Sequence, residues 1–169
     1  MAWLVTRTNR DIRVVERNGQ GAILNDPMGA ALNEARAAAE RGEVPVGAVI
    51  IKDRRLLAKS GNRMVALGDP TAHAEMLAIR AAAAEMGSGR LAGADLYVTL
   101  EPCAMCAAAI SFARIRRLYF GSADPKGGAV ENGGRFFAQP TCHHAPEVYG
   151  GLRATQSAAL LKSFFKERR

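Results

Sequence analysis

Apolar residues recur along this chain with two different periods, which divide it into alternating helices and strands. Asp26 and Pro27 are typical of a helix start, and apolar positions then repeat every three or four residues up to Gly42. The continuous apolar run at 46–52 is typical of a buried strand, and a second strand is expected at 56–60. Because only a short polar turn separates these two strands, we expect an antiparallel hairpin.

The rest of the chain continues this alternation. The expected elements are a helix at 71–86, a strand at 95–100, a helix at 104–113, a strand at 117–121, a helical turn at 135–138, a strand at 147–149 and a closing helix at 154–169. Strands joined through a helix run in the same direction, by right-handed crossovers. We therefore expect an α/β fold, with a mixed five-stranded sheet in a three-layer α/β/α arrangement and a site beyond the strand ends.

The N-terminal segment does not share these patterns. Residues 1–25 are interpreted as an extension of unknown role, followed by one domain at 26–169. The segment lacks the apolar core of a secretory signal, and its acids Asp11 and Glu16 argue against a transit peptide. A start at Met28 is the alternative interpretation. No apolar run is long enough to cross a bilayer, so no membrane association is expected.

Composition and charge narrow the compartment and the partner. Three cysteines, two of them in a metal-like pair, argue against a disulfide framework and favour a reducing compartment, which makes the cytoplasm the expected location. The net charge is +7, and the excess lies at 111–135 and 153–169, where it could meet a polyanion. A basic closing helix is equally typical of a solubilising surface.

Two short motifs carry the candidate chemistry. Cys103 and Cys106 lie three positions apart, so on a helix they share one face and can bind one ion together. His73 and Glu75 lie two positions apart and would point in different directions on a helix, so only one of them should ligate that ion. One His and two Cys would make three protein ligands. Three ligands and a water molecule are typical of a catalytic zinc, whereas a structural zinc has four protein ligands. Glu75 then fits the role of a proton shuttle to that water.

Other interpretations of the same residues remain open. A thioredoxin-like redox pair would leave His73 and Glu75 without a role. A structural zinc would need a fourth protein ligand, for which Cys142, His143 or His144 is available. Chance placement of unrelated core residues is the third alternative.

The H-x-E and P-C-x-x-C arrangement resembles that of the cytidine-deaminase superfamily, and implies a cytidine-deaminase-like fold with one zinc ion per subunit. The resemblance extends over about residues 28–169 to bacterial tRNA-specific adenosine deaminases. It rests on the segments 43–49, 62–63, 69–75, 96–103 and 164–169.

This resemblance implies a zinc-dependent hydrolase that converts the wobble adenosine of a tRNA anticodon to inosine, and that binds the anticodon stem-loop as a homodimer. It assigns zinc to His73, Cys103 and Cys106, and proton transfer to Glu75. The implied substrate-binding residues are Asn62, Ala74, Asp124, Lys126, Phe165 and Arg168. Of these, Asn62 would contact the flipped nucleoside, and Asp124 and Lys126 would face the neighbouring nucleotides. Phe165 and Arg168 would grip the anticodon loop.

Several of these residues also have a simpler structural interpretation. Asn62 can cap a turn, Lys126 can be a solvated loop tip, and Phe165 can pack into the core with its helix neighbours. The chain also departs from the family pattern, because 142–144 reads Cys-His-His where many members have Asn-His-Arg. Contacts made by that loop are therefore not carried over.

Two rival functions share the same motifs. A deaminase of a free base or nucleotide, of guanine or cytosine type, would use the same zinc machinery. The basic second half and the Phe-Phe-x-x-Arg-Arg ending favour RNA over this rival. A non-catalytic, zinc-stabilised RNA-binding domain is the other rival, and Glu75 argues against it because such a domain needs no carboxylate beside the metal.

Overall fold

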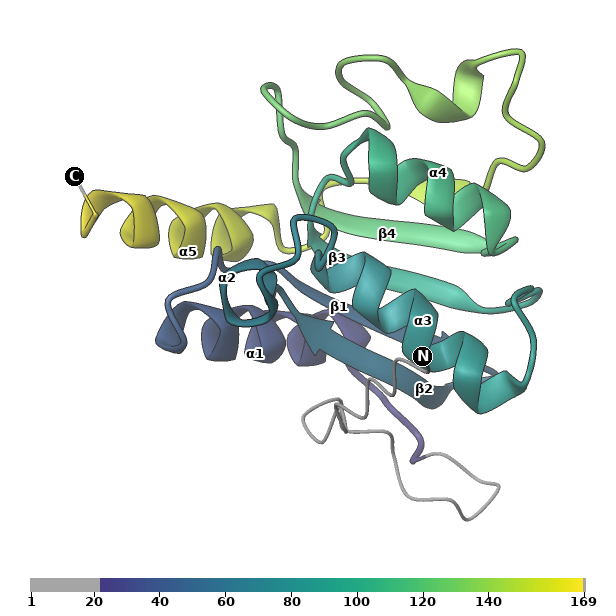
Figure 1. Cartoon of the computed structure of the whole chain (residues 1–169), viewed down its shortest axis with the longest axis horizontal. Helices are drawn as coiled ribbons and strands as arrows, with labels where there is room; N and C mark the ends of the chain where they lie inside the picture. Colours follow the sequence, from purple (N-terminus) through teal and green to yellow (C-terminus); the bar gives the residue numbers. More distant parts are fainter. Residues whose placement is uncertain (1–21, 169) are drawn as a thin grey trace, which may run out of the picture.

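The computed structural model describes residues 22–168, and it consists of a five-stranded sheet with helices on both faces (Figure 1). The strands are β1 (Gly47–Lys52), β2 (Arg55–Gly61), β3 (Asp95–Leu100), β4 (Arg117–Ser122) and β5 (Glu147–Tyr149). The helices are α1 (Pro27–Glu40), α2 (Met64–Leu67), α3 (Ala74–Met86), α4 (Ala104–Phe112) and α5 (Ala154–Lys166), with a 3₁₀ turn η1 (Phe136–Ala138). The expected α/β fold with a mixed five-stranded sheet is confirmed.

The strand order is β2-β1-β3-β4-β5. β1 runs antiparallel to both of its neighbours, β2 and β3, whereas β3, β4 and β5 pair in parallel. The predicted hairpin is confirmed. The sequence did not predict that β1 lies between the strand before α3 and the strand after it, so these two share a direction without being paired. Because β3 and β4 pair in parallel, their carboxyl ends lie side by side, and each leads into a loop.

Side chains that alternate along β1 build a core on each face of the sheet. Ala48 and Ile50 pack with residues of α3 and α4, whereas Val49 and Ile51 pack with residues of α1. All four are buried. A strand covered on both faces reads as a continuous apolar run, which explains why this pattern predicted a buried strand. Figure 1 shows α3 and α4 side by side on one face of the sheet.

Several predicted boundaries were wrong, and the reasons are local. α3 begins at Ala74 rather than at 71, because Asp69 Oδ1 accepts hydrogen bonds from Thr71 N and Oγ1 at 2.8 and 2.7 Å and holds this stretch in a turn. His73 is therefore the N-cap residue and is not in the first turn. The short helix α2 was not predicted.

The closing helix also differs from its prediction. α5 ends at Lys166. Phe164 is buried, but Phe165 is 49% exposed and so does not pack in the core.

The predicted extension lies mostly outside the described residues, since 1–21 are not described. The last residues before Asp26 are described, and they lie along the edge of β2. Ile23 forms a bridge with Arg55, and Leu24 N donates a hydrogen bond to Arg54 O at 2.9 Å. Within residues 22–168, every helix is too short or too polar to cross a membrane.

The close approach of α1 to the sheet generates a prediction at Gly61. A Cβ at this position would lie 2.6 Å from the carbonyl oxygen of Glu34 and 3.0 Å from Ala38 Cβ. Because backbone must shift to make room, we expect Gly61→Ala to lower the free energy of unfolding by about 1–3 kcal/mol in urea denaturation. The control is Gly89→Ala, since a Cβ at Gly89 meets no atom within 4 Å. Equal stabilities of the two variants would contradict this prediction.

Candidate metal centre

Three metal-type side chains meet between the N-termini of α3 and α4. His73 and Cys103 are the N-cap residues of these helices, and Cys106 follows in the first turn of α4. His73 Nδ1 lies 3.7 Å from Cys103 Sγ and 3.5 Å from Cys106 Sγ, and all three ligand atoms lie within 4.8 Å of one another. Ligands at zinc–nitrogen and zinc–sulfur bond lengths around a tetrahedral ion stand roughly 3.5–3.8 Å apart. The three atoms therefore fit one zinc ion.

The residues considered as a fourth ligand lie elsewhere. His73, Cys103 and Cys106 form the only group of His, Cys, Asp or Glu side chains within residues 22–168 that is close enough to hold a metal ion. Cys142 Sγ lies 3.6 Å from Ser111 Oγ, at the opposite end of α4, and 3.1 Å from His144 O. His144 Nε2 is 2.7 Å from the carbonyl oxygen of Ile115. Neither residue closes the candidate metal centre, so the structural-zinc alternative built on this loop was wrong.

The two cysteines differ in their protonation. Hydrogen bonds from Cys106 and His73 stabilise the Cys103 thiolate and lower its pKa to about 4. The hydrogen bond with Cys103 and burial raise the pKa of the Cys106 thiol, and the bond with Cys103 also raises the pKa of His73. A thiolate is the form in which cysteine ligates metal, and the N-terminus of α4 adds its positive dipole to this stabilisation.

Glu75 lies beside the three ligands without belonging to their group. It is in the first turn of α3 and only 4% exposed. Burial raises the pKa of its carboxyl to about 7. A buried carboxyl group with a pKa near neutrality, next to a metal site, can both accept and donate a proton.

The ligands and Glu75 open into a cleft of about 270 Å³. His73, Glu75 and Cys103 line it together with Asn62 and Asp124. The remaining lining is mostly apolar and comes from Val44, Val46, Met64 and Leu100. The cleft thus unites residues from five separate stretches of the sequence around one small opening.

Asn62 has a structural role at this cleft. It is 6% exposed, and its Oδ1 accepts a 2.8 Å hydrogen bond from Ala74 N. This bond satisfies an N–H group at the start of α3, where His73 offers no side-chain cap. Ala74 itself is fully buried, so its side chain is part of the core. Asn62 therefore fixes the helix that carries His73 and Glu75, and it also faces the cleft.

The loop after β4 places Asp124 and Lys126 differently. Asp124 lines the cleft, and its Oδ1 accepts hydrogen bonds from Lys126 N at 3.1 Å and Gly127 N at 3.0 Å. Lys126 is exposed at the tip of this turn.

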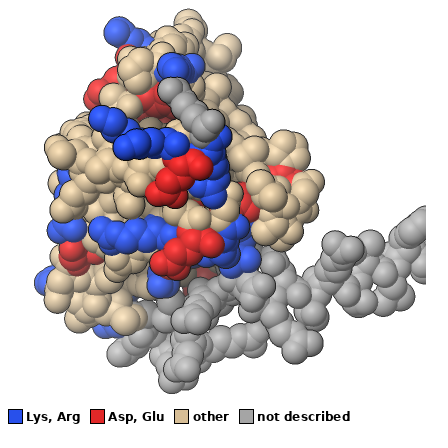
Figure 2. All heavy atoms as spheres, turned by 90° about the vertical axis from the view of Figure 1, so that its left-hand side faces the viewer, with Lys and Arg blue, Asp and Glu red and all other residues tan. Residues whose placement is uncertain are grey.

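Phe165 and Arg168 lie on α5, which projects from the body of the molecule (Figure 1). The Arg168 guanidinium sits 3.6 Å from the centroid of the Phe164 ring, while Phe165 points into solvent. Neither residue lines the cleft. Figure 2 shows the end of the molecule from which α5 projects, with many Lys and Arg side chains and some Asp and Glu between them.

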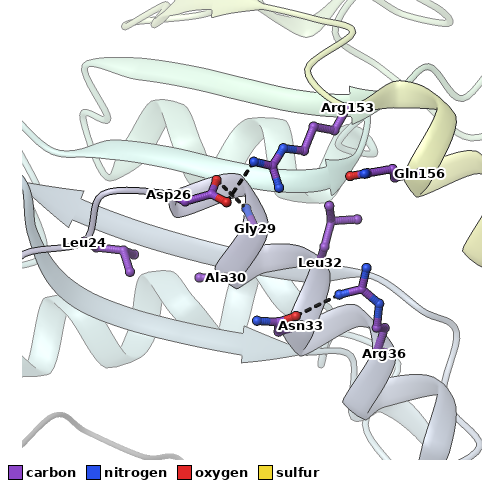
Figure 3. Close-up of a pocket in the computed structure, with 9 residues that line it drawn as sticks. All are labelled: Leu24, Asp26, Gly29, Ala30, Leu32, Asn33, Arg36, Arg153 and Gln156. Carbon is purple, nitrogen blue, oxygen red and sulfur yellow. Dashed lines mark hydrogen bonds and ion pairs between the residues drawn. The ribbon is translucent and has the colours of Figure 1, made fainter.

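A separate hollow of about 380 Å³ lies between α1 and α5 (Figure 3). Here Arg153, at the start of α5, donates a 2.8 Å bond to Asp26, the N-cap residue of α1. None of the expected site residues lines this hollow. The ion pair joins the start of α5 to α1, on the opposite face of the sheet from α3 and α4.

Two buried carboxylates that hold backbone segments were not singled out from the sequence. Glu43 accepts hydrogen bonds from Val65 N at 3.2 Å and Ala66 N at 2.8 Å, at the start of α2. Glu101 lines the cleft and binds backbone N–H groups of the loop after β4. Both are 2% exposed. Their only sequence signal is an acid placed just before or just after an apolar strand.

Comparison with known proteins gives consistent matches. Residues 24–122 match the family of the cytidine and deoxycytidylate deaminase zinc-binding region. A tRNA-specific adenosine deaminase of Agrobacterium fabrum is 66% identical over 142 residues, which cover 84% of this chain and 93% of that protein. A structure from a study of A-to-I editing by tRNA:A34 deaminases at the wobble position is 64% identical, covers 82% of this chain and 100% of its own, and has a TM-score of 0.80. A guanine deaminase structure from Bacillus subtilis is 26% identical over 83% of this chain and 92% of its own, with a TM-score of 0.57.

Proposed function

The chain belongs to the cytidine and deoxycytidylate deaminase family, and from this membership we propose that it converts the wobble adenosine of a tRNA anticodon to inosine by hydrolytic deamination. The observation that carries the chemistry is the group of His73, Cys103 and Cys106 with a buried Glu75 outside it. The relatives that support the substrate are the tRNA-specific adenosine deaminase and the tRNA:A34 deaminase, since both match most of this chain at more than 60% identity.

Zinc held by His73, Cys103 and Cys106 would supply a Lewis acid that makes water nucleophilic at neutral pH. Glu75 would take a proton from that water and deliver protons to the purine ring and to the departing ammonia. The target base must leave the anticodon stack to enter the cleft, where Val46 and Leu100 would contact its faces. Asn62 would hold its edge while keeping α3 in place.

The exposed residues of α5 and of the loop after β4 are proposed to bind the RNA outside the cleft. Phe165 is free to stack on a base, and Arg168 and Lys126 can contact phosphate or ribose oxygens. With tRNA as the substrate and thiolate ligands at the centre, the cytoplasm is the compartment we propose.

A homodimer is also proposed, with α3 and α4 at the interface. α4 (AMCAAAISF) contains no charged residue, and on it Phe112 is 69% exposed and Ala104 is exposed. The neighbouring α3 adds Met76 and Ile79, both half-buried. An uncharged helical face of this kind, beside a catalytic cleft, suits a second copy of the same chain.

The role of Glu75 leads to the first prediction of this proposal. Glu75→Gln keeps the shape of the side chain but cannot transfer a proton, so we expect kcat to fall about 10²-fold or more while zinc stays bound. Zinc is measured by inductively coupled plasma mass spectrometry, and activity by ammonia release. The control is Cys103→Ser, which should lose the metal together with the activity. Loss of zinc from Glu75→Gln in proportion to activity would instead identify Glu75 as a ligand.

The substrate is tested with a panel that contains an anticodon stem-loop with a wobble adenosine, free guanine, cytidine and deoxycytidylate. We expect ammonia release only from the stem-loop. If about two phosphates are neutralised by the protein, KM for the stem-loop should rise roughly tenfold between 50 and 200 mM salt, because counterions compete for the RNA. Turnover of free guanine that does not depend on salt would favour a free-base deaminase.

The dimer surface is tested by Phe112→Asp, which places a charge on an exposed position of α4. We expect sedimentation equilibrium to report a dimer for the wild type and mostly monomer for the variant, with an unchanged melting temperature. Val65→Asp, at a position of α2 that is 79% exposed, is the matched control and should remain dimeric. Dimers of equal affinity in both variants would place the interface elsewhere.

A further inference from the structure

Glu101 occupies a position where a second catalytic acid could be expected. It follows β3 directly, stands two residues before Cys103 and lines the same cleft as Glu75. Its side chain is almost completely buried. A buried carboxylate must be paired or hydrogen-bonded to offset its desolvation, so its partners reveal what it does.

Within residues 22–168, the hydrogen-bond partners of the Glu101 side chain lie in the loop after β4. Its Oε1 accepts hydrogen bonds from three consecutive backbone N–H groups, those of Val130 at 3.1 Å, Glu131 at 2.8 Å and Asn132 at 2.9 Å. Its Oε2 accepts from Asp124 N at 2.9 Å and from the Asn132 side chain, Nδ2, at 2.6 Å. Successive N–H groups that converge on one point form an anion-binding nest. Here the anion is a side chain of the same protein.

These bonds leave Glu101 no capacity for proton transfer. A carboxylate has about four lone-pair sites, and five donors already use them. Glu75, which is equally buried, has no such set of backbone donors from a neighbouring loop. The two carboxylates of the cleft are therefore distinguished by their partners, and not by their exposure.

The loop also encloses Glu101 closely. A Cβ on Gly128 would lie 2.5 Å from Glu101 Cδ and 2.6 Å from Asp124 O, so only glycine allows this approach. Next to it, Ala129 N donates a 2.9 Å hydrogen bond to Pro102 O, in the segment that leads to Cys103. The loop is thus attached to the metal-ligand segment at two adjacent points.

We propose that Glu101 is a positioning residue for substrate: as the internal anion of this nest, it holds the loop of residues 124–132 as one wall of the cleft. The wall includes Asp124 and Gly127, which line the cleft, and Lys126 between them. Glu101 acts on substrate binding through this loop and takes no part in the chemical step. The inference rests on the proposed function, since it assigns the loop to the binding of the anticodon.

The test is Glu101→Gln, which keeps the volume but replaces one acceptor oxygen by an NH₂ group facing N–H donors. We expect KM for the anticodon stem-loop to rise about tenfold or more with kcat within about threefold, because the lost interaction orders the binding wall. Zinc content should stay at the wild-type value. Glu40→Gln is the matched control, since it makes the same charge change at an exposed side chain at the end of α1, outside the loop and the cleft. It should leave KM and kcat unchanged.

Hydrogen exchange gives a readout that does not depend on the substrate. In Glu101→Gln, the amides of Val130, Glu131 and Asn132 should exchange faster than in the wild type, while amides of β1 stay protected. Gly128→Ala offers a second route to the same loop, because it keeps the carboxylate and displaces the chain around it. It should reproduce the rise in KM.

Three outcomes would overturn the proposal. They are a fall in kcat at constant KM, a loss of zinc, or unchanged exchange at the three loop amides in a folded Glu101→Gln protein. A wild-type enzyme that leaves the stem-loop unmodified would refute the proposed function instead. The exchange measurement would then still decide whether Glu101 holds the loop.

Discussion

The meeting of two helix N-termini is the feature on which this structure depends. α3 and α4 each begin directly after a ligand, His73 or Cys103, whose backbone carbonyl accepts the first hydrogen bond of its helix. The N-terminal end of a helix carries unpaired N–H groups and a partial positive charge, which favour thiolate over thiol. The same geometry that starts the helices therefore brings an imidazole and two sulfurs to the spacing of one tetrahedral ion.

Three buried carboxylates, Glu43, Glu75 and Glu101, differ in their hydrogen-bond partners. Glu43 binds the N–H groups that begin α2, and Glu101 binds those of the loop after β4. Glu75 has no comparable set of donors, and burial moves its pKa toward neutrality. Glu43 and Glu101 thus hold backbone segments in place through their hydrogen bonds. Hydrogen bonds offset the burial of Glu43 and Glu101, whereas the pKa of Glu75 rises instead. The exposed fraction of a carboxylate therefore does not distinguish these cases.

The cleft suits binding of a base, whereas selection of RNA depends on the surface around the cleft. The apolar walls and the metal ligands suit any flat base that carries an exocyclic amine, and a guanine deaminase shares this fold. Discrimination in favour of RNA must then come from outside the cleft. On α5, which lies outside the cleft, Phe164 is buried beneath Arg168 and Phe165 is exposed. The exposed Asp26–Arg153 ion pair joins the start of α5 to α1.

The sequence by itself determined most elements of the fold, and it singled out the three metal-type side chains that meet in the structure and Glu75 outside their group. These features are local. The direction of each side chain follows from the helix or strand that carries it, so the apolar periods and the spacing of Cys103 and Cys106 can be interpreted without the tertiary structure. Only the tertiary structure decided that β1 lies between β2 and β3, and that Glu101 receives its hydrogen bonds from residues 124–132. Pairing between strands and capture of a distant loop depend on contacts between residues far apart in the chain, which no local period encodes. For the same reason, the helical spacing of Phe164 and Phe165 left open whether Phe165 packs in the core or faces a partner, and the packing of α5 leaves it 49% exposed.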